Sequence, residues 1–126
     1  MKPVNKKNFV SMLSEDLPVL CFFYEKNEDN PNKQIKEIKD VVIKIEKQLP
    51  KLKTFEFVRN MTEDDEYFCD MMEIAKYPIL IIYKDGCFSR FKSKDFSEKE
   101  ILKFLGNTKI YQEKEEKANT VSVDLY

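Results

Sequence analysis

Apolar runs and alternating segments along the chain predict three central strands. Two continuous apolar runs, at 19–24 and 79–83, are rich in β-branched and aromatic residues and are bounded by turn-forming residues. Runs of this kind are typical of strands that are buried on both faces of a sheet. A third segment, 54–58, alternates loosely between apolar and polar residues and predicts another strand. We therefore expect a sheet whose middle strands are covered on both faces.

The spacing of apolar residues predicts helices between these strands. The clearest helix ends at Pro50 and carries one apolar stripe, made of Ile35, Ile38, Val42, Ile45 and Leu49. A shorter amphipathic helix is expected over 5–14, with the apolar residues Phe9, Val10, Met12 and Leu13. A third helix is expected after the capping residue Thr62, with an apolar face made of Phe68, Met71, Met72 and Ala75.

The ordered part of the chain is predicted to close with a hairpin and a capped helix. Asp-Gly at 85–86 suits a tight turn that needs positive φ angles, so a partner strand is expected over 87–91. Ser97 and Glu100 then match the capping-box pattern of a helix N-terminus. This helix should end at the Gly-Asn pair 106–107 and bury Leu102, Phe104 and Leu105.

The order of these elements predicts an α/β fold with a mixed sheet. A helix between consecutive strands implies right-handed crossovers and a parallel start to the sheet, whereas the closing hairpin must be antiparallel. We expect a central sheet of four to five strands with helices on both faces. The domain should span 1–106, and 107–126 should be a charged tail that is flexible when free. The alternation of polar and apolar residues at 120–126 would also suit an added strand or a partner contact.

Composition and charge exclude several functions. At 126 residues the chain has the size of one domain, and 42% of its residues are hydrophobic, which is enough for a core. The 22 basic residues balance 23 acidic ones, and Arg59 and Arg90 are the only arginines, so no direct binding of nucleic acid is expected. No apolar run is long enough to span a membrane. The chain has no histidine, and the acidic cluster at 63–66 lacks the spacing of a calcium loop, so neither a metal nor a cofactor is expected.

The three cysteines, Cys21, Cys69 and Cys87, lie far apart and form no Cys-x-x-Cys pair. With no apolar leader, the expected location is intracellular, cytoplasmic rather than nuclear, where thiols stay reduced. Cys21 lies in an apolar run and is predicted to be a small buried residue. Cys69 lies beside the apolar face of its helix and should be half-buried. Cys87 follows the hairpin glycine and is the candidate for an exposed, reactive thiol.

The segment 77–86, Tyr-Pro-Ile-Leu-Ile-Ile-Tyr-Lys-Asp-Gly, resembles the part of thioredoxins in which a cis-proline opens a buried strand that leads into a hairpin. The last helix also follows where the thioredoxin family places its own, and the resemblance extends over about 4–106. It implies a thioredoxin-like fold with a cis peptide bond before Pro78. Only about 5% of X-Pro bonds in folded proteins are cis, so this expectation is specific.

The motif that gives thioredoxins their activity is missing. Active members carry Cys-x-x-Cys in the loop after the first long buried strand, at a helix N-terminus that lowers the pKa of the first thiol. The matching stretch here, 25–32, contains no cysteine, serine or threonine. The resemblance therefore implies a redox-inactive member, because two-cysteine disulfide exchange is excluded at this site. Cys21 lies near the position at which the family keeps a buried acidic residue, a role to which a thiol is poorly suited.

The resemblance also implies a place for a protein partner. In thioredoxins the residue before the cis-proline lies beside the active-site loop, and the two form a shallow groove that holds an extended peptide. The groove residues implied here are Asn27, Glu28, Asp29, Asn30, Tyr77 and Pro78. Tyr77 would either anchor a partner or cap the edge of the core, and the sequence leaves both readings open.

These features predict a non-catalytic thioredoxin-like adaptor, or a subunit of a larger assembly, that binds a protein partner of unknown identity. One alternative is an enzyme, either a one-cysteine thiol oxidoreductase or a glutathione-linked protein, that uses Cys87 or Cys69. Another is a purely structural subunit whose surfaces are covered by its neighbours. The absence of a thiol at any predicted helix N-terminus disfavours the enzyme.

Overall fold

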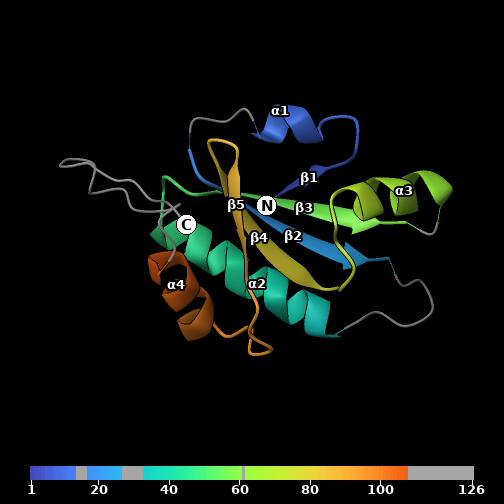
Figure 1. Ribbon diagram of the computed structural model, residues 1–126. Helices are drawn as coiled ribbons and strands as arrows, with labels where there is room; N and C mark the ends of the chain where they lie inside the picture. The colour runs from blue at the N-terminus through green and yellow to red at the C-terminus, as the bar shows by residue number, and fades with distance from the viewer. Residues whose placement is uncertain (14–16, 27–32, 61, 108–126) are drawn as a thin grey trace.

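The computed structural model describes residues 1–13, 17–26, 33–60 and 62–107, in which five strands form one mixed sheet (Figure 1). The strands are β1 Lys2–Val4, β2 Val19–Glu25, β3 Lys53–Arg59, β4 Ile79–Lys84 and β5 Cys87–Arg90. Their order in the sheet is β1-β3-β2-β4-β5. β1 and β2 run parallel to β3, whereas β4 is antiparallel to both β2 and β5. The expected mixed sheet with a parallel start and an antiparallel hairpin is confirmed.

Helices cover both faces of this sheet (Figure 1). They are α1 Phe9–Leu13, α2 Lys33–Gln48, α3 Glu63–Met71 and α4 Glu98–Asn107. α2 and α4 pack on one face, and α1 and α3 pack on the other. In the part of the chain that the structure describes, no helix is both long and apolar enough to cross a bilayer.

The side chains of β2 supply both hydrophobic clusters, because successive residues of a strand point to opposite faces. Leu20 and Phe22 enter the cluster under α2 and α4, and Cys21 and Phe23 enter the cluster under α1 and α3. All four side chains are fully buried. The prediction that 19–24 is a strand buried on both faces is therefore confirmed, as is the prediction that Cys21 is a small buried residue.

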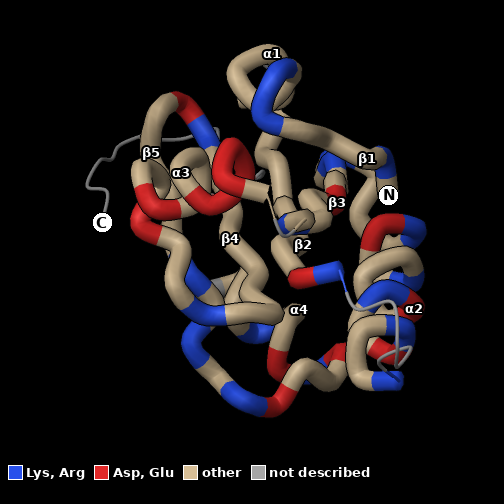
Figure 2. The backbone as a smooth tube through the Cα atoms, turned by 90° about the vertical axis from the view of Figure 1, so that its right-hand side faces the viewer, with Lys and Arg blue, Asp and Glu red and all other residues tan. Residues whose placement is uncertain are grey.

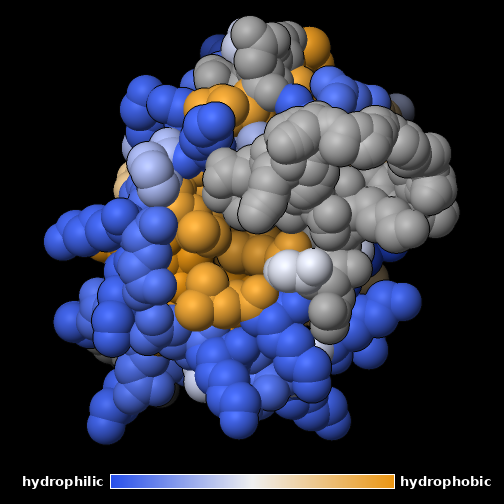
Figure 3. All heavy atoms as spheres, turned by 90° about the vertical axis from the view of Figure 1, so that its left-hand side faces the viewer, coloured by the Kyte–Doolittle hydropathy of each residue, from blue (hydrophilic) through white to orange (hydrophobic). Residues whose placement is uncertain are grey.

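The cluster under α2 contains the apolar stripe that the sequence predicts. Ile38, Val42 and Ile45 are buried in it, and Ile35 and Leu49 pack against it as partly buried residues. At the end of the molecule where α4 lies, hydrophobic side chains gather in the middle of the surface, with hydrophilic ones to the left of them and below them (Figure 3). The stripe is confirmed, and it fixes α2 across the sheet.

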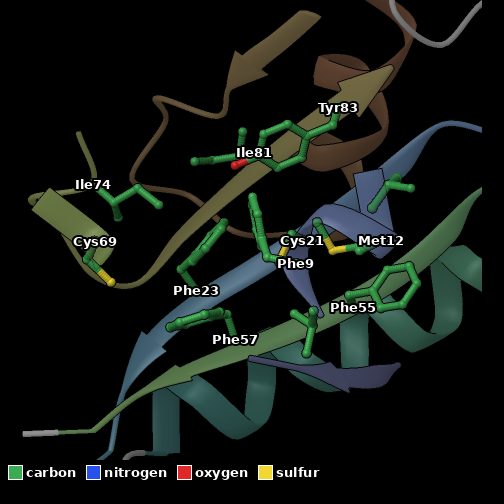
Figure 4. Close-up of a cluster of buried hydrophobic side chains, with 12 residues drawn as sticks. Phe9, Met12, Cys21, Phe23, Phe55, Phe57, Cys69, Ile74, Ile81 and Tyr83 are labelled. Carbon is green, nitrogen blue, oxygen red and sulfur yellow. The ribbon is translucent and has the colours of Figure 1, made fainter. Parts of the chain in front are cut away.

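Aromatic rings fill the cluster under α1 and α3 (Figure 4). The ring of Phe9 meets that of Phe68 edge-on, with 5.2 Å between the centroids, and that of Tyr83 at 5.8 Å. Phe68 in turn stacks on Phe57 at 5.3 Å. α1 has only five residues, too few for a helix that is stable alone. It is therefore held in place by the packing of its buried side chains.

The N-terminal region differs from the sequence prediction. β1 is not predicted at all, because it has three residues and only Val4 is buried. α1 is shorter than the helix expected over 5–14, of which residue 14 lies outside the described part of the chain. With little more than one turn, α1 directs Phe9 and Met12 to the core and leaves Val10 73% exposed.

The two ends of β4 have uncommon backbone geometry. At its C-terminal end Asp85 and Gly86 have φ angles of 52° and 80°, and Lys84 pairs with Cys87. Two consecutive positive φ angles are typical of a two-residue hairpin turn, so the predicted hairpin is confirmed. At the N-terminal end of β4 the Tyr77-Pro78 peptide bond is cis.

α3 ends earlier than the sequence predicts, and its buried face is different. Met71 is 60% exposed, whereas Cys69, expected to be half-buried, is only 1% exposed. The reason is Glu73, the residue after the C-cap Met72: it has a φ of 59°, and its N–H donates to the carbonyl of Asp70 at 3.0 Å. The N–H of Ile74 donates to the carbonyl of Cys69 at 2.9 Å, which completes a Schellman motif. The chain turns there, so that Ile74 and Cys69 enter the core in place of Met71.

Glycine at position 73 should stabilise the fold, because a side chain disfavours the left-handed conformation of Glu73. We expect Glu73→Gly to raise the free energy of unfolding by about 0.5–1 kcal/mol in urea denaturation. Lys103→Gly, at an exposed position inside α4, is the control and should lower it by about 1 kcal/mol. Equal destabilisation by the two substitutions would contradict the assigned helix end.

α4 begins with a cap that the sequence predicts in part. The Ser97 hydroxyl accepts a hydrogen bond from the N–H of Glu100 at 3.3 Å. The N–H of Ser97 donates to a carboxylate oxygen of Asp95 at 3.0 Å, so Asp95 takes the place expected for the Glu100 side chain. The helix ends at Asn107, and the rest of the expected tail, 108–126, lies outside the described residues. The domain boundary at 106 stays a prediction.

Candidate partner-binding groove

Tyr77 and Pro78 lie beside a groove of about 640 Å³ at the start of β4. We call it the Pro78 groove; its described lining consists of 76–79, 90–94, Gln34 and Phe96. These segments are distant in sequence. They meet because β4 lies next to β5 in the sheet while the beginning of α2 reaches the same end of the molecule (Figure 1).

The floor of the Pro78 groove is apolar and tightly packed. Phe91 is only 5% exposed, and its ring lies 5.2 Å from the centroids of both Phe96 and Phe104. The N–H of Phe91 donates to the carbonyl of Leu80 at 2.9 Å, which extends the pairing of β4 past the end of β5. A floor that is ordered before a ligand arrives can bury an apolar side chain at little entropic cost to the protein.

Tyr77 forms one wall of the groove, and its hydroxyl is used inside the protein. The hydroxyl donates to the carbonyl of Ile74 at 3.1 Å. Burial, and to a smaller extent the neighbouring Cys69 thiol, raises the pKa of the Tyr77 hydroxyl. The side chain packs against the cluster under α1 and α3. The structure thus places Tyr77 at the edge of the core and beside the groove at once, with its hydroxyl bound inside the protein.

Arg59 fixes this wall from behind. Its Nη1 lies 2.7 Å from a carboxylate oxygen of Glu25, and its Nη2 lies 3.3 Å from one of Glu66. The guanidinium also lies over the Tyr77 ring, 5.5 Å from the centroid. The Arg59 side chain is only 14% exposed, so these charge-assisted contacts are partly shielded from water. They tie β2, β3, α3 and Tyr77 together and hold the groove wall in one position.

The backbone before Pro78 has hydrogen-bonding groups that no described residue pairs with. Within the described residues, neither the N–H nor the C=O group of Tyr77 forms a hydrogen bond, and Tyr77 lies two residues before Ile79, the first residue of β4. Backbone groups left unpaired beside a strand can pair with an added extended segment. The corner therefore offers one donor and one acceptor to a partner backbone.

Basic side chains surround the groove. Lys76, Arg90, Lys92 and Lys94 belong to its lining, and the described lining contains no carboxylate. In Figure 2 blue segments, which mark Lys and Arg, follow the lower left of the tube between the labels of β5 and α4. Sequence reasoning missed this feature, because only the fold brings Lys76 beside Lys92 and Lys94.

None of the three cysteines belongs to the described lining of the Pro78 groove. Cys21 is fully buried, and this burial, followed by the charge of Glu56, raises the pKa of its thiol well above the usual value. Burial also raises the pKa of Cys69, which Figure 4 shows within the cluster under α1 and α3. Cys87, the candidate for an exposed thiol, is half-buried in the hairpin at the far end of β4. It pairs with Lys84, and a strand rises about 3.3 Å per residue, so Cys87 lies about 20 Å from Pro78.

The other side of the expected groove falls on Asn27, Glu28, Asp29 and Asn30, which lie outside the described residues. The described part of the site is therefore the side formed by Tyr77, Pro78 and 90–94. Among the described residues no group of histidine, cysteine, aspartate and glutamate side chains is placed to hold a metal ion.

Comparison with known proteins establishes the fold. No protein-family model matches the chain, and no curated protein matches it. The thioredoxin f2 of Chlamydomonas reinhardtii superimposes with a TM-score of 0.67 at 13% identity, over 84% of this chain and 94% of that one. A designed protein gives 0.66 at 17% identity, over 86% and 94%. ERdj5 in its form II gives 0.67 at 14% identity, over 86% of this chain, which corresponds to only 14% of the ERdj5 chain.

The chain therefore has the thioredoxin-like fold that the segment 77–86 predicts. At identities of 13% to 17% these likenesses concern the fold and do not extend to activity, substrates or partners.

Proposed function

We propose that this chain is a non-catalytic thioredoxin-like adaptor, or a subunit of a larger assembly, that holds an extended segment of a protein partner in the Pro78 groove. The intracellular setting that belongs to this proposal rests on the sequence alone. Redox inactivity belongs to it as well, because the stretch 25–32 has no cysteine and no thiol is among the described lining residues of the groove.

The unpaired backbone of Tyr77 carries the proposal. A segment laid along 76–78 can exchange hydrogen bonds with the N–H and C=O groups of Tyr77 while one of its apolar side chains packs toward Phe91. Two such hydrogen bonds contribute about 0.5–1.5 kcal/mol each, and one buried apolar side chain about 1.5–3 kcal/mol. That sum is less than the roughly 8 kcal/mol of a micromolar complex, so further contacts at the rim must add to it.

The alternative of a one-cysteine oxidoreductase lacks such support. Its thiol would have to reach a substrate as a thiolate. Cys69 is 1% exposed, and Cys87 lies in the hairpin away from the groove. Neither observation favours the enzyme over the adaptor.

Selection of random peptides displayed against the folded protein tests the adaptor proposal. We expect peptides to be recovered whose affinity falls at least about tenfold in Ser93→Trp, because an indole at this lining position fills the Pro78 groove. Ser11→Trp adds the same side chain at an exposed position of α1 and should bind as the wild type does. Titration calorimetry measures both, and thermal denaturation establishes that both variants are folded.

Two results would contradict the proposal. If the wild-type protein selected no peptide, the groove would lack the expected peptide binding. Equal affinity of the wild type and Ser93→Trp for a recovered peptide would place the binding surface elsewhere.

A further inference from the structure

We infer that the partner segment held in the Pro78 groove is acidic, with Asp or Glu side chains that face Lys76, Lys92 and Lys94. The inference rests on the proposed function and adds the chemistry of the partner to it. Ion pairs with these lysines would also add the binding free energy that the backbone hydrogen bonds and the apolar floor do not supply.

The positive charge of the groove is local. The protein as a whole carries a formal net charge of −1, with 22 basic and 23 acidic residues. The described lining of the groove nevertheless has four basic side chains and no acidic one. A concave surface lined by charges of one sign raises the local concentration of ligands of the opposite sign. The described side of the groove therefore attracts an acidic polypeptide segment.

Three of these basic side chains are exposed and open to a ligand. Lys76, Lys92 and Lys94 form no ion pair with any residue that the structure describes. Elsewhere lysines do find carboxylates: the ammonium groups of Lys39 and Lys44 lie 3.1 Å from oxygens of glutamates. The groove lysines thus keep their charge available for carboxylates supplied by a partner.

Arg90 acts differently, because its guanidinium is already held. Its Nη2 donates to the carbonyl of Glu73 at 3.1 Å and to that of Met72 at 3.4 Å. It also lies over the ring of Phe88, 5.0 Å from the centroid. Arg90 therefore adds positive potential to the groove from a fixed position, while the three lysines can adjust to a ligand.

The positive region ends at Lys94. A second hollow of about 300 Å³ shares Gln34, Lys94 and Phe96 with the groove and has Glu37 and Asp95 in its lining. Acidic residues of the partner should therefore cluster over the half of the groove nearer to Pro78. Residues that continue toward Glu37 should be neutral or basic.

A polypeptide fits this surface better than a nucleic acid. Single strands of nucleic acid bind by stacking their bases on exposed aromatic rings. In the groove the ring of Phe91 is buried, and that of Phe96 packs against it with 5.2 Å between the centroids. The ring of Tyr77 is covered on one side by the guanidinium of Arg59. The unpaired backbone groups of Tyr77 match an extended peptide.

Random-peptide display with charge-reversal variants tests the inference. We expect peptides selected on the wild-type protein to be richer in Asp and Glu than the input library. For a synthetic peptide from this set, the association rate constant should fall at least about tenfold in the variant Lys76→Glu/Lys92→Glu/Lys94→Glu. The matched control reverses three exposed lysines outside the lining, Lys2→Glu/Lys7→Glu/Lys103→Glu, and has the same net charge. It should change the rate constant by no more than about twofold.

The outcomes separate the two proposals. Selected peptides that are neutral or basic, yet lose affinity in Ser93→Trp, would overturn the acidic partner and leave the adaptor intact. Equal loss in the groove variant and in its control would also overturn the inference, because only general repulsion would then be at work. A labelled oligonucleotide that binds the groove more tightly than the selected peptides would do the same. Failure to select any peptide would count against the adaptor itself.

Discussion

Phe9→Ala should lower the free energy of unfolding by about 3–5 kcal/mol, a large share of the 5–15 kcal/mol that a domain of this size has. Phe9 is 2% exposed, and its ring contacts Phe23, Phe68 and Tyr83, with 5.2–6.2 Å between the centroids. It joins α1 to α3 and to the sheet at once. Its truncation therefore removes buried apolar area and leaves a cavity that the five residues of α1 cannot close.

The neighbouring residue provides the control. Val10 belongs to the same short helix but is 73% exposed, so Val10→Ala should change the free energy of unfolding by no more than about 0.5 kcal/mol. Urea denaturation followed by circular dichroism measures both variants. A loss of less than about 1 kcal/mol for Phe9→Ala would mean that α1 does not cover the sheet as described.

Alkylation in the folded protein should separate the three thiols by orders of magnitude. The thiolate is the reactive form, and burial both raises the pKa of Cys21 and Cys69 and blocks access of the reagent. We expect Cys21 to react at least about a thousandfold more slowly than Cys87, because its exposure requires the sheet to open, and Cys69 at least about a hundredfold more slowly. Mass spectrometry of samples quenched at intervals measures each rate.

Denaturant provides the control, because unfolded thiols should react at similar rates. A thiol that reacts in the folded protein much faster than free cysteine would contradict redox inactivity and favour the one-cysteine oxidoreductase. Fast alkylation of Cys69 in particular would contradict its place in the cluster under α1 and α3.

Most of the fold could be predicted because its signals are local. The apolar runs at 19–24 and 79–83 indicate buried strands, and Asp85 and Gly86 have the positive φ angles that their residue types favour. β1 escaped prediction because three residues with a single buried side chain carry no periodicity. The end of α3 was not predicted, because Glu73, and not glycine, takes the left-handed position. For the same reason Cys69 was predicted to be half-buried, whereas it is buried.

The candidate site was predictable only in part. The position of Tyr77 and Pro78 at the start of a buried strand can be read from the segment that contains them. The approach of Lys76 to Lys92 and Lys94 depends on the pairing of β4 with β5 and on the path of the chain after β5, which no local pattern specifies. The predicted intracellular location and the role of 27–30 stay predictions.

Nuclear magnetic resonance of the isotope-labelled protein with a selected peptide shows most directly whether the Pro78 groove is the binding surface. We predict that the largest shifts of backbone amide signals fall on 76–79 and on 90–94, and that the signal of Tyr77 shifts most. Pro78 gives no signal, because it has no amide proton. Cys87→Ser should leave these shifts unchanged, because the thiol takes no part in binding. Shifts that gather instead on α1, α3 and the exposed ring of Phe88, or that vanish in Cys87→Ser, would contradict the assignment of the groove as a non-catalytic partner site.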